Sequence, residues 1–232
     1  MAVLRAGIGT RVDRDRDGWP PVILRWFAVA VTLPACVPPH AARGAPACST
    51  DGVAVVASQR DVARLAGCRV LGGLVIRTGT ALDLSPLAAL TAVAGDLVIG
   101  PTVAIESVTL GALGRIGGAV RVVSNGSLQG LYLTQLTDAG GIEVAGNAVI
   151  ATVALPGLTA VHGALQVIDN PALEALDLSA LTAIDQELVV TGAPALTVAL
   201  APQLQRAAAV QLDAPKLPPE LARALRSVAP GP

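Results

Sequence analysis

The sequence of 232 residues has few aromatic and few charged side chains, which make up 2% and 14% of it. Three of the aromatic residues fall within the first 27 positions, so that Tyr132 is the one aromatic beyond them. The formal net charge is −1, so the chain has no excess of positive charge, and this argues against nucleic acid as a partner. The mean hydropathy is +0.63 despite 24 glycines and 17 prolines, and this excludes disorder of the whole chain.

An apolar segment near the N-terminus has the pattern of an export signal. Arg25 is followed by ten uncharged and largely apolar residues and then by Cys36, a pattern typical of a signal peptide and too short to span a bilayer. Residues 33–36 read Leu-Pro-Ala-Cys and resemble the bacterial lipobox, whose cysteine is lipidated and becomes the mature N-terminus. The resemblance predicts a signal peptide over 1–35 and lipidation of Cys36. An ordinary secretory signal, cut near Ala47, is the alternative.

The chain has three cysteines, Cys36, Cys48 and Cys68, and an odd count in an exported protein leaves one thiol to explain. Lipidation of Cys36 removes that thiol, so Cys48 and Cys68 are predicted to form a disulfide in an oxidising compartment. Two cysteines with no nearby histidine cannot complete a zinc site, and we expect neither a metal nor a cofactor. Residues 36–47 are rich in proline and alanine and are predicted to be a tether.

Most of the remaining chain is a repeat of 22 or 23 residues. Each repeat carries two apolar residues separated by one other, at Leu74/Ile76, Leu97/Ile99, Val120/Val122, Ile142/Val144, Leu165/Val167, Leu188/Val190 and Val210/Leu212. Glycines precede most of these pairs, where a tight corner would need freedom in φ. A second alternating segment, such as Leu131/Leu133, follows within the repeats. A period of two is typical of strands and not of helices.

A unit of 23 residues cannot bury its own hydrophobic face and must stack on its neighbours. The sequence therefore predicts a mainly β protein, a parallel β-solenoid of about seven rungs of 22–23 residues that spans residues 48–215. Residues 53–56 predict a further strand, and Ser58 with Asp61 forms a capping-box pattern that begins a short N-terminal cap helix. Residues 216–232 are predicted to be a C-terminal tail with a second short helix.

Asparagine recurs at one corner of the predicted coil. Asn125, Asn147 and Asn170 each lie three residues after a main apolar pair. Stacked inside the solenoid, their amides would satisfy backbone groups as a ladder, and we favour this structural role over a binding role. Asn125 also begins a glycosylation sequon, which the same ladder would block.

Residues that could perform catalysis are scattered over the repeats. His162 and Asp185 occupy equivalent corner positions on successive repeats, close enough to touch, but no serine, cysteine or second acid shares their column. Asp169 is the lone carboxylate of its column, and Glu143 lies between Arg121 and Gln166, where it is predicted to form an ion pair across rungs. We interpret these groups as structural and predict that the protein is not an enzyme.

These residues resemble the receptor L domain, a leucine-rich-repeat-like β-helix found in insulin- and epidermal-growth-factor-receptor ectodomains and in bacterial exported lipoproteins. The resemblance rests on Cys48 and Cys68, on residues 70–76 after them and on later units such as 173–184, and it covers about residues 48–213. It implies a right-handed β-helix and a disulfide between the two cysteines. No ligand-contacting residue is carried over, because the receptors use aromatic and charged side chains that this chain lacks.

The sequence thus predicts a non-catalytic exported lipoprotein that presents its solenoid to another protein or to the cell envelope. Val37, directly after the lipidated cysteine, is not a retention residue by the rule for enterobacterial lipoproteins, which favours the outer membrane or cell surface over the inner membrane. Secretion without an anchor is the alternative location. A carbohydrate-binding or polysaccharide-processing β-helix is the alternative function, disfavoured because Tyr132 alone offers an aromatic platform. A leucine-rich-repeat horseshoe with a helical return is disfavoured by the second alternating segment.

Overall fold

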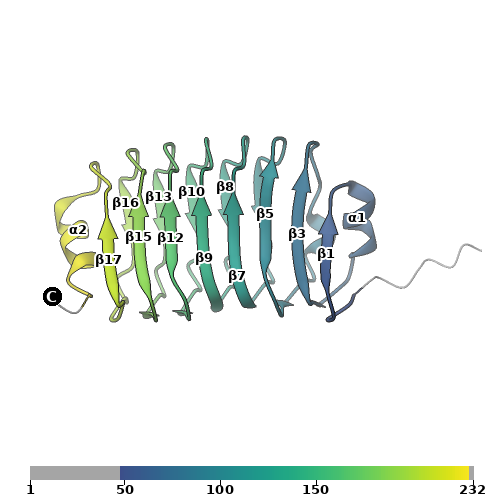
Figure 1. Ribbon diagram of the computed structural model, residues 1–232, viewed down its shortest axis with the longest axis horizontal. Coiled ribbons are helices and arrows are strands. Elements are labelled where there is room, and N and C mark those ends of the chain that lie inside the picture. Colours follow the sequence, from purple (N-terminus) through teal and green to yellow (C-terminus); the bar gives the residue numbers. More distant parts are fainter. Residues whose placement is uncertain (1–47, 230–232) are drawn as a thin grey trace, which may run out of the picture. The chain divides into compact units, whose positions relative to one another are not determined.

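The computed structural model describes residues 48–229, which form a parallel β-solenoid of about seven turns of about 23 residues (Figure 1). The prediction of a mainly β solenoid is confirmed. The predicted signal peptide over 1–35, the lipidation site Cys36 and the tether over 36–47 lie outside the described residues.

The main sheet runs along the whole solenoid. Its strands lie in the order β1 (Val53–Val56), β3 (Gly73–Thr78), β5 (Leu97–Thr102), β7 (Arg115–Val123), β9 (Asp138–Ala145), β12 (Leu165–Ile168), β15 (Glu187–Thr191) and β17 (Ala209–Leu212). Neighbours are parallel, and the register places Leu97 beside Val120 and Ile99 beside Val122. These side chains are fully buried. The apolar pairs of the sequence are therefore the inward residues of the main sheet, stacked turn upon turn.

A second sheet covers the opposite side of the core. It consists of β6 (Ser107–Thr109), β8 (Gly130–Tyr132), β10 (Thr152–Ala154), β13 (Ala175–Asp177) and β16 (Val198–Leu200), all in parallel register. The middle residue of each strand points inward, as Val108, Leu131 and Val153 show by being fully buried. The return segment of the five turns that contribute these strands is thus extended. The horseshoe alternative, which requires a helical return, is wrong for these residues.

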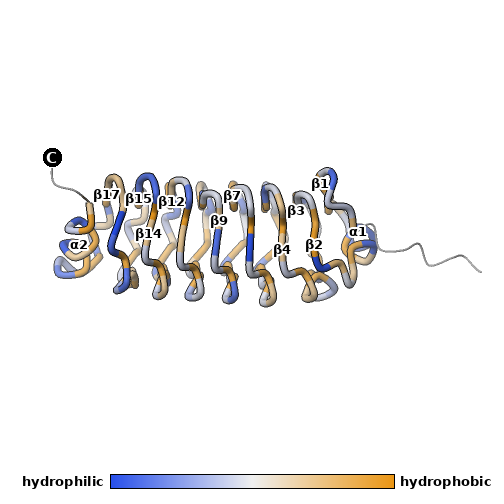
Figure 2. The backbone as a smooth tube through the Cα atoms, turned by 90° about the horizontal axis from the view of Figure 1, so that it is seen from below, coloured by the Kyte–Doolittle hydropathy of each residue, from blue (hydrophilic) through white to orange (hydrophobic). Residues whose placement is uncertain are grey.

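A third set of short strands was not anticipated from the sequence. The strands β2 (Val70–Leu71), β4 (Ala92–Val93), β11 (Ala160–Val161) and β14 (Ala183–Ile184) align with the first residues of β7 and β9 (Figure 2). Each contributes one inward residue, such as Leu71 or Val93. A single apolar residue displays no period, so this segment carries no strand signal in the sequence.

Glycines at the corner before the main sheet are required for space. The expected reason, freedom in φ, is wrong, because Gly95, Gly117 and Gly140 all lack a positive φ. A Cβ atom on Gly117 would lie 2.2 Å from the carbonyl oxygen of Ala94, and one on Gly140 would lie 2.7 Å from that of Gly117. The main chains of adjacent turns approach so closely here that a side chain would collide with backbone.

At the N-terminal end, β1 and α1 (Gln59–Arg64) cover the first full turn. Ser58 is the N-cap residue of the helix, and its hydroxyl and backbone N–H donate to the Asp61 carboxylate at 2.7 and 2.9 Å. These hydrogen bonds, with that of the Ser58 hydroxyl foremost, lower the pKa of Asp61 below its ordinary value of 3.8. The predicted capping box is confirmed. Val62 and Leu65 are buried over the open end of the core.

At the C-terminal end, α2 (Pro219–Arg226) packs against β17 through the buried Leu225. The Arg226 guanidinium donates to the carbonyl oxygen of Leu212 at 2.9 Å and fixes the helix to the last strand. The 3₁₀ helix η1 (Ser85–Leu87) stands in the first turn where later turns have a strand of the second sheet. The second sheet therefore begins with the turn of β5, whereas the main sheet already contains β1 and β3.

Candidate functional site

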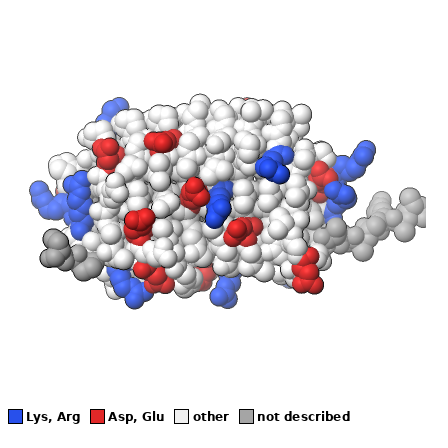
Figure 3. Space-filling model, in the orientation of Figure 1, with Lys and Arg blue, Asp and Glu red and all other residues white. Residues whose placement is uncertain are grey.

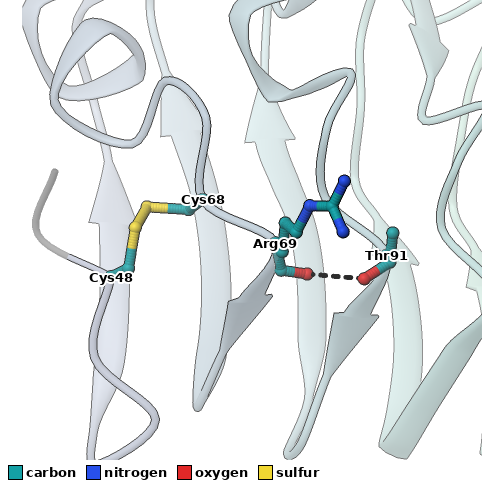
Figure 4. Close-up of a disulfide and its surroundings, with 4 residues drawn as sticks. All are labelled: Cys48, Cys68, Arg69 and Thr91. Atoms are coloured by element: carbon teal, nitrogen blue, oxygen red, sulfur yellow. Dashed lines mark hydrogen bonds between the residues drawn. A yellow bond between two sulfur atoms is a disulfide. The ribbon is translucent and has the colours of Figure 1, made fainter.

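The disulfide between Cys48 and Cys68 closes the N-terminal end (Figure 4). The predicted pairing is confirmed, with Cα atoms 5.3 Å apart. Cys68 is buried and Cys48 is exposed. Next to Cys68, the carbonyl oxygen of Arg69 accepts a hydrogen bond from the Thr91 hydroxyl of the following turn at 2.9 Å. The disulfide thus joins the segment ahead of β1 to the start of the first complete turn.

The three asparagines predicted as a ladder lie fully buried at one corner and are hydrogen-bonded turn to turn. The Asn125 amide nitrogen donates to Oδ1 of Asn147 at 2.8 Å, and that of Asn147 donates to Oδ1 of Asn170 at 3.0 Å. Each amide nitrogen also donates to a main-chain carbonyl oxygen of the preceding turn, of Ile99, Val122 and Val144. The asparagine ladder leaves no free amide for a ligand among these three residues, and the buried Asn125 does not offer its sequon to solvent.

The residue before each ladder asparagine has a left-handed backbone. The φ angle is 56° at Ser124, 64° at Gly146 and 53° at Asp169. The backbone N–H groups of these residues donate to carbonyl oxygens of the next turn at 3.0 Å. Asp169, the lone carboxylate of its column, is therefore a turn residue, since aspartate tolerates this conformation better than most residues.

A row of ionisable side chains follows a different, exposed corner. Asp138, His162, Asp185 and Arg206, here called the charged corner, come from four successive turns. His162 lies 3.2 Å from Asp138 through Nε2 and 3.4 Å from Asp185 through Nδ1, and Arg206 lies 2.6 Å from Asp185.

The charged corner extends the predicted His162–Asp185 pair to an acid that stands outside the column of these two residues. A second acid, Asp138, does reach the histidine, because its side chain leans across from the adjacent strand β9 although it stands in a different column. A histidine that activates a nucleophile directs one ring nitrogen to that nucleophile. Both ring nitrogens of His162 face carboxylates. The arrangement therefore supports an exposed charge ladder and not a catalytic dyad.

A column of threonines was also missed from the sequence. The hydroxyls of Thr137, Thr159 and Thr182 each donate to a main-chain carbonyl oxygen of the preceding turn at 2.9 Å. Their spacing of 22 or 23 residues was visible in the sequence, but threonine is a common strand residue and gave no separate signal. These hydroxyls connect turns at the solenoid surface.

The two large faces differ in charge. On the main sheet, Arg121 lies 3.7 Å from Glu143, as predicted, and the Gln166 amide donates to Glu187 at 3.1 Å (Figure 3). The outward residues of the second sheet, here called the second-sheet face, are Ser107, Thr109, Gly130, Tyr132, Thr152, Ala154, Ala175, Asp177, Val198 and Leu200. Among these ten described positions, Asp177 alone carries a charge.

The Tyr132 ring covers Gly130 near the middle of the second-sheet face. A Cβ atom on Gly130 would lie 2.5 Å from the tyrosine ring, so the ring occupies the space that a side chain would fill. The tyrosine is half-buried. Glycine at this position permits an aromatic ring to lie on an otherwise small-residue surface.

The described residues contain no helix that is long and apolar enough to cross a bilayer, nor a group of three His, Cys, Asp or Glu side chains that could hold a metal ion. No protein-family model matches the chain, and neither a curated protein nor a solved structure matches it. The geometry of the described residues is therefore the basis for a functional argument.

Proposed function

We propose that the protein is a non-catalytic exported lipoprotein, anchored through Cys36, that presents its second-sheet face to a protein partner in the cell envelope. The observation that carries the proposal is the character of this face. It is continuous over five strands, nearly free of charge, and has Tyr132 near its middle. The cores of protein interfaces are depleted in charged residues, and tyrosine is enriched among the residues that dominate binding.

Export and anchoring are supported by features at the N-terminal end. A disulfide persists in oxidising compartments and is rare in the cytosol, so the Cys48–Cys68 bond favours an exported protein. It leaves Cys36 as the unpaired cysteine, in the lipobox-like residues 33–36. The bond directly ahead of the first turn is also the feature on which the resemblance to the receptor L domain rests. We assign the chain to that kind of recognition module, at the outer membrane or cell surface.

A non-catalytic role is supported by the use that the fold makes of its polar residues. The asparagine ladder bonds its amides to main chain and to itself. The charged corner pairs its members with one another, and Asp169 forms a turn. These are the described groups that a sequence search would single out for catalysis, and each has a structural role.

Carbohydrate binding is the second candidate, and one observation favours it. Tyr132 is partly exposed on the second-sheet face, and an accessible aromatic ring is the usual platform for a sugar ring. The second-sheet face would then bind a glycan in place of a protein. Both candidates place binding on the same surface, so one pair of experiments separates them.

The first experiment incorporates a photo-crosslinking residue at Thr152 or, as the matched control, at Gln166 in the exported protein. Both positions are outward and half-buried, but they lie on opposite sheets. The proposal predicts a discrete protein adduct from position 152 and none from position 166. Adducts of equal yield from both positions, or from 166 alone, would contradict the proposed face.

The second experiment screens the exported protein against a glycan array, with Tyr132→Ala as the control. The proposal predicts no glycan that binds in a Tyr132-dependent way. A glycan whose binding is lost in Tyr132→Ala would replace the protein partner with a carbohydrate.

A further inference from the structure

Charge is unevenly distributed along the solenoid. Residues 48–80, which form the N-terminal end, hold four arginines and two aspartates. Residues 81–213, which form most of the turns, hold three arginines and eleven acidic residues. The N-terminal end is therefore cationic, while the body of the solenoid is strongly acidic.

The cationic end is exposed, and it also carries apolar side chains. Arg60, Arg64 and Arg69 are exposed on and just after α1, and basic side chains project at this end (Figure 3). Val53 and Val55 of the edge strand β1 are 63% and 50% exposed, the first being among the most exposed large hydrophobic side chains of the described residues. Asp61 pairs with Arg64, while the exposed Arg60 and Arg69 form no ion pair within the described residues.

We propose that this N-terminal end, here called the cationic end, docks onto an anionic lipid surface. Arginines interspersed with exposed aliphatic side chains form a surface suited to lipid headgroups, because the guanidinium groups meet phosphates while the apolar side chains enter the interface. The acidic body would be repelled by the same surface. Electrostatic attraction to the anionic lipids therefore favours contact through this end and not through the flanks of the solenoid.

The proposal deepens the proposed function and rests on it for one element, the anchor at Cys36. Eleven residues separate that cysteine from Cys48, and such a segment spans at most roughly 40 Å even when fully extended. The lipid would hold the cationic end within reach of the headgroups. When the cationic end contacts the membrane, the second-sheet face, which runs along the side of the solenoid, stays accessible to a partner.

The test uses the protein as its host exports it, combined with vesicles of pure phosphatidylcholine or of an equimolar mixture with phosphatidylglycerol. Hydrogen exchange should be slower over residues 51–79 on the anionic vesicles, with residues 214–229 unchanged. Equal exchange of residues 51–79 on both kinds of vesicle would overturn the proposal. The mass of the N-terminal peptide reports separately on lipid at Cys36. If that lipid is absent, sedimentation with the same vesicles tests docking on its own.

Two matched variants decide whether the effect belongs to this end. Arg60→Gln/Arg69→Gln and Lys216→Gln/Arg223→Gln each remove two exposed positive charges, from opposite ends of the solenoid. A basic residue near an anionic bilayer contributes about fivefold to binding, so the first variant should weaken docking by about 25-fold. The second should leave docking unchanged. An equal loss in both variants would show attraction by net charge alone and would overturn the proposal.

Discussion

The asparagine ladder and the charged corner are both polar columns repeated turn upon turn, but one is buried and the other is exposed. In the ladder every asparagine has no exposed surface, and its amide bonds to main chain of the preceding turn. In the charged corner the side chains are 36–70% exposed, and their contacts are with one another. The comparison teaches that burial, more than the chemistry of the side chain, decides how much a repeated polar residue contributes to this fold.

The largest effect is expected from Asn147→Leu, in the middle of the ladder. The substitution removes side-chain hydrogen bonds to Val122, Asn125 and Asn170 in a fully buried corner, and it takes Oδ1 away from the Asn125 backbone N–H that donates to it. We expect the free energy of unfolding, measured by urea denaturation, to fall by about 3–5 kcal/mol. A loss below about 1 kcal/mol would show that burial does not make the ladder essential.

Removal of the disulfide is expected to have the next largest effect. Cys68→Ser opens a loop with a sequence separation of 20 residues, and the free energy of unfolding should fall by about 3 kcal/mol. Hydrogen exchange should accelerate over residues 49–76 while residues 131–167 stay protected, since terminal turns lack a neighbour. Uniform loss of protection along the solenoid would contradict a role restricted to the N-terminal end.

Two glycine substitutions test whether the close backbone contact between turns contributes to stability, as the asparagine ladder is expected to do. Gly140→Ala places a Cβ atom 2.7 Å from a main-chain oxygen of the adjacent turn, whereas Gly111→Ala meets nothing within 4 Å. We expect the first to lower the free energy of unfolding by about 1–3 kcal/mol and the second to leave it unchanged or slightly raised. Equal effects of the two substitutions would contradict the spatial role given to the corner glycines.

The smallest effect is expected from His162→Ala in the charged corner. Its contacts with Asp138 and Asp185 are exposed to solvent, so thermal and urea unfolding should change by less than about 1 kcal/mol. A loss as large as that of Asn147→Leu would remove the contrast between the two columns.

The repeat allowed the architecture to be predicted from sequence in unusual detail. The main pairs, the second alternating segment and the asparagine column keep one register over the repeats, and each maps onto a stacked strand or corner. The capping box of Ser58 and Asp61 was visible as well, since it depends on neighbours in the chain.

The features that were missed depend on contacts between turns that spacing alone does not reveal. Asp138 contacts His162 from a different column of the repeat. The two residues are 24 positions apart, which does not match the repeat of 22 or 23 residues, so the sequence does not indicate the contact. The corner glycines resemble turn glycines in sequence, and the proximity of Ala94 to Gly117 is visible only in three dimensions. The second-sheet face consists mostly of uncharged residues, and nothing in the sequence sets them apart from any other outward position.

Lipidation at Cys36 tests the central claim, an anchored exported solenoid, most directly. The protein is expressed in a bacterial host that processes lipoproteins and is labelled with palmitate, with Cys36→Ser and Cys48→Ser as paired variants. The account predicts label and detergent partitioning in the unaltered protein and in Cys48→Ser, and loss of both in Cys36→Ser. Unchanged labelling of Cys36→Ser would contradict the anchor.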